Sequence, residues 1–198
     1  MKNKVFMGLA AVAMVAVLSS CGKKPQAEID AANAAIEAAK TAEAAVYVPA
    51  AFAAVQDSLN AVMSDITAQE SKLFKKFGPD KAKLASIVTL ANKVAADAGT
   101  KKEEVKAEAA NLLTGIKSVI EENGKLIPKL PRGKEGAAVI EQIKADVGTV
   151  DASVVEAQGL FDKGSFMDAL NKIKAAKEKA DGLNAEVKEA LTKAKIKF

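Results

Sequence analysis

Apolar residues recur every three or four positions over most of this 198-residue chain, and this spacing limits its possible folds more than any other feature. One stripe comprises Phe52, Val55, Leu59, Val62, Ile66 and Leu73. Another comprises Ile140, Ile143, Val147, Val150, Val154, Ala157 and Phe161. A third takes every seventh residue: Leu84, Ala91, Ala98, Val105, Leu112 and Val119. A seven-residue repeat keeps one seam of a helix against a partner helix.

Strand signals are missing, because no stretch alternates β-branched and polar residues between turn markers. We therefore expect an all-α protein, an elongated antiparallel bundle of helical hairpins with coiled-coil-like seams. Alanine occupies many seam positions, so stability should come from helix propensity, Glu–Lys pairs and long rows of small contacts. The aromatic residues expected in the core are Phe52, Phe74, Phe77, Phe161 and Phe166.

Prolines and glycines divide the helical part of the chain. Pro49 favours the first turn of a new helix, and Phe77-Gly78-Pro79 predicts a turn. Asn123-Gly124 predicts a helix end, and the prolines that follow exclude a regular helix. The expected parts are a helical domain (residues 27–123), a Pro/Gly/Lys linker (124–136) and a C-terminal helical hairpin that packs on the first domain (137–198).

Two positions leave helix boundaries open. At Gly99-Thr100 the residues are typical of a helix end followed by a capping box to Glu103. The seven-residue spacing nevertheless continues across this point, so either a break or one long helix from Pro79 to Asn123 fits the sequence. Gly182 raises the same question more weakly.

A faint internal repeat links the two halves of the chain. Leu73-Phe74 followed by Gly78 resembles Leu160-Phe161 followed by Gly164, and each set predicts a helix, a turn and a second helix. In the second set, Ser165 is expected to cap the helix through its side chain. Duplicated hairpins would explain the repeat, and so would convergence between helices rich in Ala, Lys and Glu.

The N-terminus has the layout of a secretory signal: a basic start, an apolar run from Val5 to Leu18, and small residues before Cys21. The apolar run is shorter than the roughly 20 residues that a membrane-spanning helix needs. Leu18-Ser19-Ser20-Cys21 resembles the lipobox of bacterial lipoproteins. The resemblance implies a signal peptide over residues 1–20, cleavage between Ser20 and Cys21, and a lipid with acyl chains such as palmitate on the Cys21 thiol. The alternative is an ordinary signal peptide and a free thiol.

Residues 21–26 would then form a short lipidated tether that keeps the folded part close to the membrane. Gly22 stands where inner-membrane lipoproteins of enterobacteria carry Asp, and Lys23-Lys24 differ from the acidic patch of surface lipoproteins in the Bacteroidota. By resemblance we expect the periplasmic leaflet of the outer membrane, with the inner membrane and the cell surface left open. The formal net charge of the chain is +4, and cleavage would lower it by removing Lys2 and Lys4. The small charge that remains gives no support to nucleic-acid binding.

The residue types restrict the chemistry of the chain. There is no histidine and a single cysteine, so Ser–His, Cys–His and His–metal arrangements are excluded within it. Glu103-Glu104 and Glu121-Glu122 could supply carboxylates, but neighbours on a helix point apart, and solvated helix faces are the simpler interpretation. No phosphate-binding glycine loop or calcium-loop spacing is present. We expect no enzyme activity, no cofactor, no metal and no small-molecule substrate.

The segment from Lys125 to Lys134 combines clustered cations with apolar residues. Its candidate contacts for anionic headgroups or an acidic partner are Lys125, Lys129, Arg132 and Lys134. The alternative is a linker in which Leu126, Ile127 and Leu130 cover the end of a bundle while the cations stay solvated.

The chain from Ala27 to about Ala96 resembles an alanine-rich helical domain of unknown function found in bacterial envelope lipoproteins. The resemblance is carried by Ala31-Ala32-x-Ala34-Ala35-Ile36-x-Ala38-Ala39, by Tyr47-Val48-Pro49-Ala50-Ala51-Phe52 and by Leu59-Asn60-Ala61. It implies no catalytic residues. We expect a membrane-anchored helical adaptor that binds envelope proteins or peptidoglycan. The alternatives are a periplasmic holdase-like chaperone, which needs a concave apolar patch, and an enzyme, which needs a buried carboxylate pair.

Overall fold

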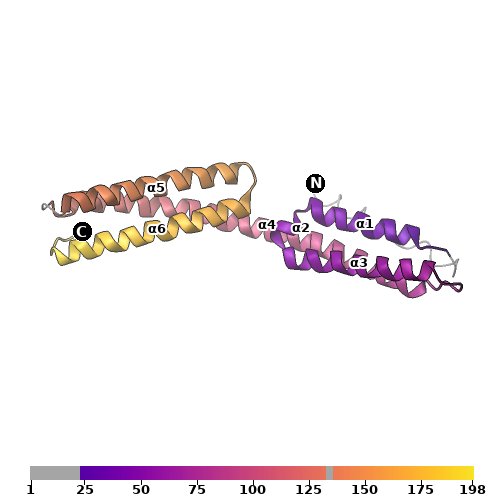
Figure 1. The fold of residues 1–198 in the computed structure, drawn as a ribbon. Helices are drawn as coiled ribbons and strands as arrows, with labels where there is room; N and C mark the ends of the chain where they lie inside the picture. The colour runs from indigo at the N-terminus through magenta and orange to yellow at the C-terminus, as the bar shows by residue number, and fades with distance from the viewer. Residues whose placement is uncertain (1–22, 133–135) are drawn as a thin grey trace, which may run out of the picture. The chain divides into compact units, whose positions relative to one another are not determined.

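All of the regular secondary structure in the described residues is helical. The computed structural model describes residues 23–132 and 136–198. Its elements are α1 (Gln26–Thr41), α2 (Ala44–Tyr47), α3 (Pro49–Glu70), α4 (Gly78–Leu126), the 3-10 helix η1 (Ile127–Lys129), α5 (Gly136–Asp162) and α6 (Phe166–Lys193) (Figure 1). These residues contain no strand, which confirms the all-α prediction. The expected signal segment with Ser20 and Cys21, and Lys134 of the basic loop, lie outside the described residues.

The chain forms two compact units that divide within α4. Unit 1 comprises the described residues up to Lys40 together with Ala50–Val94, and unit 2 comprises Thr41–Pro49 and Ala95–Phe198. The segment 124–136, expected to link two domains, therefore lies inside unit 2. The reason is that α5 and α6 share a core with the C-terminal part of α4, so no boundary falls between them.

Unit 1 contains α1, α3 and the N-terminal part of α4, and ion pairs give the directions of these helices. Lys81 Nζ near the start of α4 lies 3.0 Å from Glu28 Oε1 near the start of α1, so these two helices run parallel. Lys83 Nζ lies 2.6 Å from Asp65 Oδ2 near the end of α3, so α3 runs antiparallel to both. The core of unit 1 includes Ile29, Ala32, Ile36, Phe52, Val55, Val62, Ile66, Phe77, Leu84, Ile87 and Ala91.

Unit 2 has the same up-down-up order, with the C-terminal part of α4 followed by α5 and α6. Lys174 Nζ of α6 lies 2.6 Å from Glu108 Oε1 of α4, and Lys188 Nζ lies 2.8 Å from Glu122 Oε1. The same offset in residue number separates both pairs, so α4 and α6 run parallel in a constant register. α5 packs along α6 in the opposite direction (Figure 1).

A buried polar pair lies in the seam between α4 and α6. Asn123 is 1% exposed, and its Nδ2 donates to the carbonyl oxygen of Ala180 at 3.2 Å. Its Oδ1 accepts from Asn184 Nδ2 at 2.8 Å. A buried amide destabilises any alignment of the helices in which these hydrogen bonds are lost. The pair therefore favours one register, the register that the two ion pairs also show.

α4 is unbroken at Gly99, and α6 is unbroken at Gly182. A Cβ atom added at either glycine would meet nothing within 4 Å, so neither glycine is required by packing. The alternative of one long helix, left open by the sequence, is thus the one found. None of the described helices is both long enough and apolar enough to cross a membrane.

The buried stripe of α4 follows the predicted seven-residue spacing only over its first part. Leu84, Ala91, Ala98 and Val105 are buried at the expected positions. Beyond Val105 the stripe moves by one residue, so that Leu113 is buried and Leu112 is half-buried. An α-helix has about 3.6 residues per turn, so a straight helix drifts out of a strict seven-residue repeat, and a shift of one residue restores its buried face.

Two local predictions about helix ends are wrong. Asn123-Gly124 does not end a helix, because α4 continues to Leu126. Ser165 precedes α6 but makes no capping hydrogen bond through its side chain. The turn is formed by backbone instead: Gly164 has a φ of 82°, and the Ser165 N–H donates to the Leu160 carbonyl oxygen at 3.0 Å. This is the glycine-dependent way of ending α5, the helix before the turn.

These two kinds of glycine predict opposite effects of alanine. We expect Gly99→Ala to raise the free energy of unfolding by about 0.5–1 kcal/mol, because alanine favours a helix interior. We expect Gly164→Ala to lower it by about 1–2 kcal/mol, because alanine disfavours a positive φ. Urea unfolding followed by circular dichroism measures both. A loss of stability in Gly99→Ala would contradict a continuous α4.

Candidate functional site

The basic loop after α4 presents its cations to solvent and its apolar residues to a core. Lys125, Lys129 and Arg132 are exposed. The apolar residues of the loop join a buried cluster with α5 and α6, formed by Leu126, Ile127, Leu130, Ile140, Ile143, Val187 and Leu191. This arrangement matches the linker alternative, in which η1 covers one end of a bundle. The fourth candidate cation, Lys134, lies outside the described residues.

The paired glutamates of α4 are exposed, and Glu103, Glu104 and Glu122 form ion pairs with lysines. Glu104 Oε2 lies 2.9 Å from Lys101 Nζ, and Glu122 Oε1 lies 2.8 Å from Lys188 Nζ. The hydrogen bond from Lys188, supported by one from Asn184, holds the pKa of the Glu122 carboxyl below its usual value. A carboxylate of lowered pKa is a poor general acid at neutral pH, because it holds no proton to give.

A set of charged and aromatic side chains gathers in unit 2 around the short helix α2. We call Glu43, Tyr47, Lys102, Lys106 and Phe166 the Tyr47 cluster. Lys102 forms an ion pair with Glu43, and its Nζ lies 5.9 Å from the ring centre of Tyr47 and 6.0 Å from that of Phe166. Lys106 Nζ lies 5.4 Å from the Phe166 ring centre. Such cation–ring contacts contribute about 0.5–1 kcal/mol each at exposed sites.

The backbone at the start of α2 is strained. Glu43 has a φ of 59°, in the left-handed region that residues with a side chain rarely adopt. Its carbonyl oxygen accepts from the Tyr47 N–H at 3.1 Å, and its carboxylate pairs with Lys102. These contacts offset the strain and fix the turn between α1 and α3.

Tyr47 is held in its protonated form. Burial raises the pKa of the Tyr47 hydroxyl above its usual value, the charge of Glu43 raises it further, and Lys102 opposes both effects. A group whose folded pKa is raised adds stability below its unfolded pKa of about 10, and this stability is lost as the pH rises through the folded pKa. At neutral pH Tyr47 is therefore a neutral packing residue.

The Tyr47 cluster fastens α2 to α4 and α6. Its hydroxyl is protonated, its carboxylate is paired, and its lysines lie beside rings. The described part of the chain contains no group of three or more Cys, Asp or Glu side chains placed to hold a metal. The lysines and Phe166 that contact Tyr47 lie too far from it along the chain to be inferred from the sequence.

The segment between α3 and α4 departs most from the sequence prediction. Leu73 is 90% exposed and Phe74 is 81% exposed, although a buried stripe and a core aromatic were expected there. The reason is that α3 ends at Glu70, so the helical spacing no longer applies to them. A signal was present, because lysines surround the pair at Lys72 and Lys75-Lys76, as is common in exposed segments.

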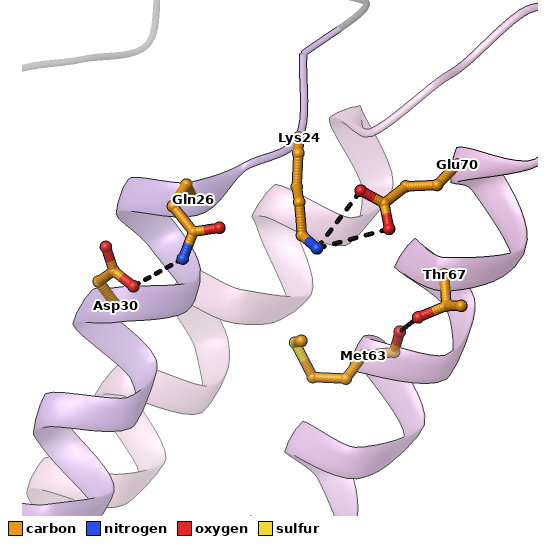
Figure 2. A network of polar contacts seen from close by, with 6 residues as sticks. All are labelled: Lys24, Gln26, Asp30, Met63, Thr67 and Glu70. Atoms are coloured by element: carbon orange, nitrogen blue, oxygen red, sulfur yellow. Dashed lines mark hydrogen bonds and ion pairs between the residues drawn. The ribbon is translucent and has the colours of Figure 1, made fainter.

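The start of α1 lies beside the end of α3. Lys24 Nζ lies 3.3 Å from Glu70 Oε1 and 3.4 Å from Oε2 (Figure 2). On the neighbouring turns, Gln26 Nε2 donates to Asp30 Oδ1 at 2.8 Å, and Thr67 Oγ1 donates to the Met63 carbonyl oxygen at 2.9 Å. The ion pair thus holds the segment before α1 against the end of α3, within unit 1.

The electrostatics of the Tyr47 cluster predict a titration. The chain has one tyrosine and no tryptophan, so the ultraviolet absorbance of tyrosinate reports Tyr47 alone. We expect its pKa to lie above about 10 in the folded protein and to return to about 10 in urea. Lys102→Met should raise the folded pKa further, and Glu43→Gln should lower it. Lys101→Met is the control and should leave it unchanged; the same shift in both lysine variants would contradict the cluster geometry.

The geometry of the described residues thus consists of two helical cores, a packed charged–aromatic cluster and two basic loops. Comparisons with protein-family models, with curated proteins and with solved structures found no match to this chain. Its function is therefore argued from its own residues.

Proposed function

We propose that this chain is a non-enzymatic lipoprotein of the bacterial envelope, anchored through Cys21 on the periplasmic leaflet of the outer membrane. Its helical body acts as an adaptor that binds other envelope proteins or peptidoglycan. The observation that carries the proposal is the ion pair between Lys24 and Glu70. In the sequence, Lys24 follows Leu18-Ser19-Ser20-Cys21, which resembles a lipobox, after only two residues.

This ion pair leaves almost no spacer between the proposed anchor and the folded unit. Lys24 is three residues from Cys21, a distance of at most about 11 Å along an extended chain. α1 begins at Gln26. A lipid on Cys21 would therefore hold unit 1 close to the membrane surface, without a long linker between them. Such a placement suits a protein that presents a partner close to the bilayer.

The distribution of exposed apolar side chains favours an adaptor over a holdase chaperone. A chaperone of unfolded clients needs a contiguous apolar surface. The large apolar residues exposed in the described chain are Val46, Leu73, Phe74, Leu90, Val139, Val155 and Phe198. Apart from Leu73 and Phe74, they are separated from one another along the sequence. The surface of unit 2 also carries ion pairs such as Lys174–Glu108, Lys179–Asp146 and Lys188–Glu122.

The anchor can be tested by metabolic labelling. In a bacterial host fed a palmitate analogue, we expect the wild-type protein to carry the label and to sediment with membranes. Cys21→Ala should lose the label entirely, because no other cysteine is present. Gly22→Ala is the matched control and should keep the label. Unlabelled wild-type protein, or label retained in Cys21→Ala, would overturn the lipid anchor.

The adaptor can be tested by crosslinking in intact cells followed by mass spectrometry. We expect a small, stoichiometric set of envelope proteins or peptidoglycan fragments, and we expect Cys21→Ala to lose it because the unanchored protein is diluted away from the membrane. A broad spread of unfolded barrel proteins would instead support the chaperone. Recovery of no crosslinked species would contradict both functions.

A further inference from the structure

We propose that the segment Ser71–Lys76, here called the α3–α4 loop, is a membrane-contact site that binds an anionic lipid surface. Leu73 and Phe74 enter the boundary between headgroups and acyl chains, and Lys72, Lys75 and Lys76 bind the anionic headgroups. The exposure and the charge of the loop are independent of the proposed function. Only the identity of the membrane, the one that carries the Cys21 lipid, rests on the proposed function.

Two adjacent apolar side chains of the α3–α4 loop are exposed. Leu73 is 90% exposed and Phe74 is 81% exposed, more than any other large apolar residue described. Poor local packing does not explain this, because Phe77, three residues later, is fully buried. The equivalent pair in the faint repeat, Leu160-Phe161, lies inside α5 and is half-buried. The α3–α4 loop thus holds its apolar pair out of the core that accepts Phe77.

The α3–α4 loop is positively charged. Lys72, Lys75 and Lys76 are all exposed, and within the residues that the structure describes no ion pair engages their side chains. The sequence from Ser71 to Pro79 contains no acidic residue. On one side, Glu70 is occupied by Lys24, and on the other, Asp80 is buried. Lysines that flank exposed Leu and Phe side chains are the combination that binds anionic membrane surfaces.

Ion pairs place the α3–α4 loop near the start of α1. Lys24 pairs with Glu70 at the end of α3, and Glu28 pairs with Lys81 near the start of α4. The α3–α4 loop therefore lies at the end of unit 1 where α1 begins (Figures 1 and 2). Cys21 is three residues before Lys24, so a lipid there and the loop would meet the same bilayer.

A membrane fits the loop better than a protein partner does. A stable protein interface needs about 800 Å² from each partner. One aromatic and one aliphatic side chain offer far less, because even a fully covered aromatic buries only about 150–250 Å². Binding to a bilayer does not require a surface that matches the shape of the loop. A lipid on Cys21 would fix only one point of the protein at the bilayer, and a second contact at the loop would also define its orientation.

The experiment places a fluorophore in the loop, which is possible because the chain has no tryptophan. The full chain with Phe74→Trp is purified from membranes and reconstituted into phosphatidylethanolamine–phosphatidylglycerol vesicles that contain brominated lipid. We expect a blue-shifted emission that the bromine quenches. Val155→Trp in α5, at a position 72% exposed, is the matched control and should show neither effect. Equal quenching of the two variants, or none in Phe74→Trp, would overturn the loop contact.

Charge variants test the lysines and compare the two basic loops. In the Phe74→Trp background, Lys72→Gln, Lys75→Gln and Lys76→Gln together should weaken the contact by about five-fold per lysine and remove its preference for anionic over phosphatidylcholine vesicles. The matched set Lys125→Gln, Lys129→Gln and Arg132→Gln should leave the quenching unchanged. A loss of quenching in the second set instead of the first would overturn the assignment. Circular dichroism should show the same helix content in all variants, because each replaced side chain is exposed.

The same vesicles separate this inference from the proposed anchor. Acylation of Cys21 is read by mass spectrometry of the reconstituted protein. Acylated protein whose Phe74→Trp fluorophore is not quenched would overturn the loop contact and leave the anchor standing. Unacylated protein with a quenched fluorophore would overturn the anchor and support the loop. A blue shift without quenching by brominated lipid would indicate a protein contact and overturn the membrane site.

Discussion

The packing seam along α4 is the interaction on which both cores depend. Several of its positions are alanines, and Ala91, Ala98 and Ala109 are completely buried. Alanine lets two helices approach closely but removes little apolar surface from water, so each contact stabilises the fold only slightly. Stability must come from the length of the seam and from the alignment of its helices. This is why the buried amide of Asn123 and the evenly offset pairs of Glu108 and Glu122 matter, since they favour one register among many that alanine alone would tolerate.

The sequence predicted the helices and most of the buried stripes, because apolar spacing directly reflects which face of a helix is buried. It could not decide whether the helix breaks at Gly99, because the local residues are typical of a helix end while the apolar spacing continues across them. The structure has an unbroken α4 at this position. The sequence placed Leu112 in the buried stripe, where the structure has Leu113, because a fixed seven-residue template ignores the drift of a straight helix. It assigned Leu73 to a core because spacing alone does not show that α3 has already ended at Glu70.

The candidate sites were predictable to different degrees. The proposed anchor at Cys21 is a contiguous motif, so the sequence alone suggests it, and it stays a prediction. In the basic loop the sequence left two interpretations, and the buried contacts of Leu130 match the linker. The Tyr47 cluster could not be predicted, because Glu43 and Lys102 are 59 positions apart and meet only in the folded chain. The α3–α4 loop could be recognised only after the structure showed Phe74 in solvent.

The unbroken α4 also bears on how the protein loses its structure. Residues on both sides of Val94 belong to one hydrogen-bonded ladder, yet they serve two different cores. If one core melts, its part of α4 loses its packing partners, and the disruption spreads along the ladder toward the other core. Two compact units joined by a loose linker would melt independently, each with its own midpoint. A helix shared by both units instead couples their unfolding. Destabilising one unit then lowers the protection of backbone amides in the other unit against hydrogen exchange.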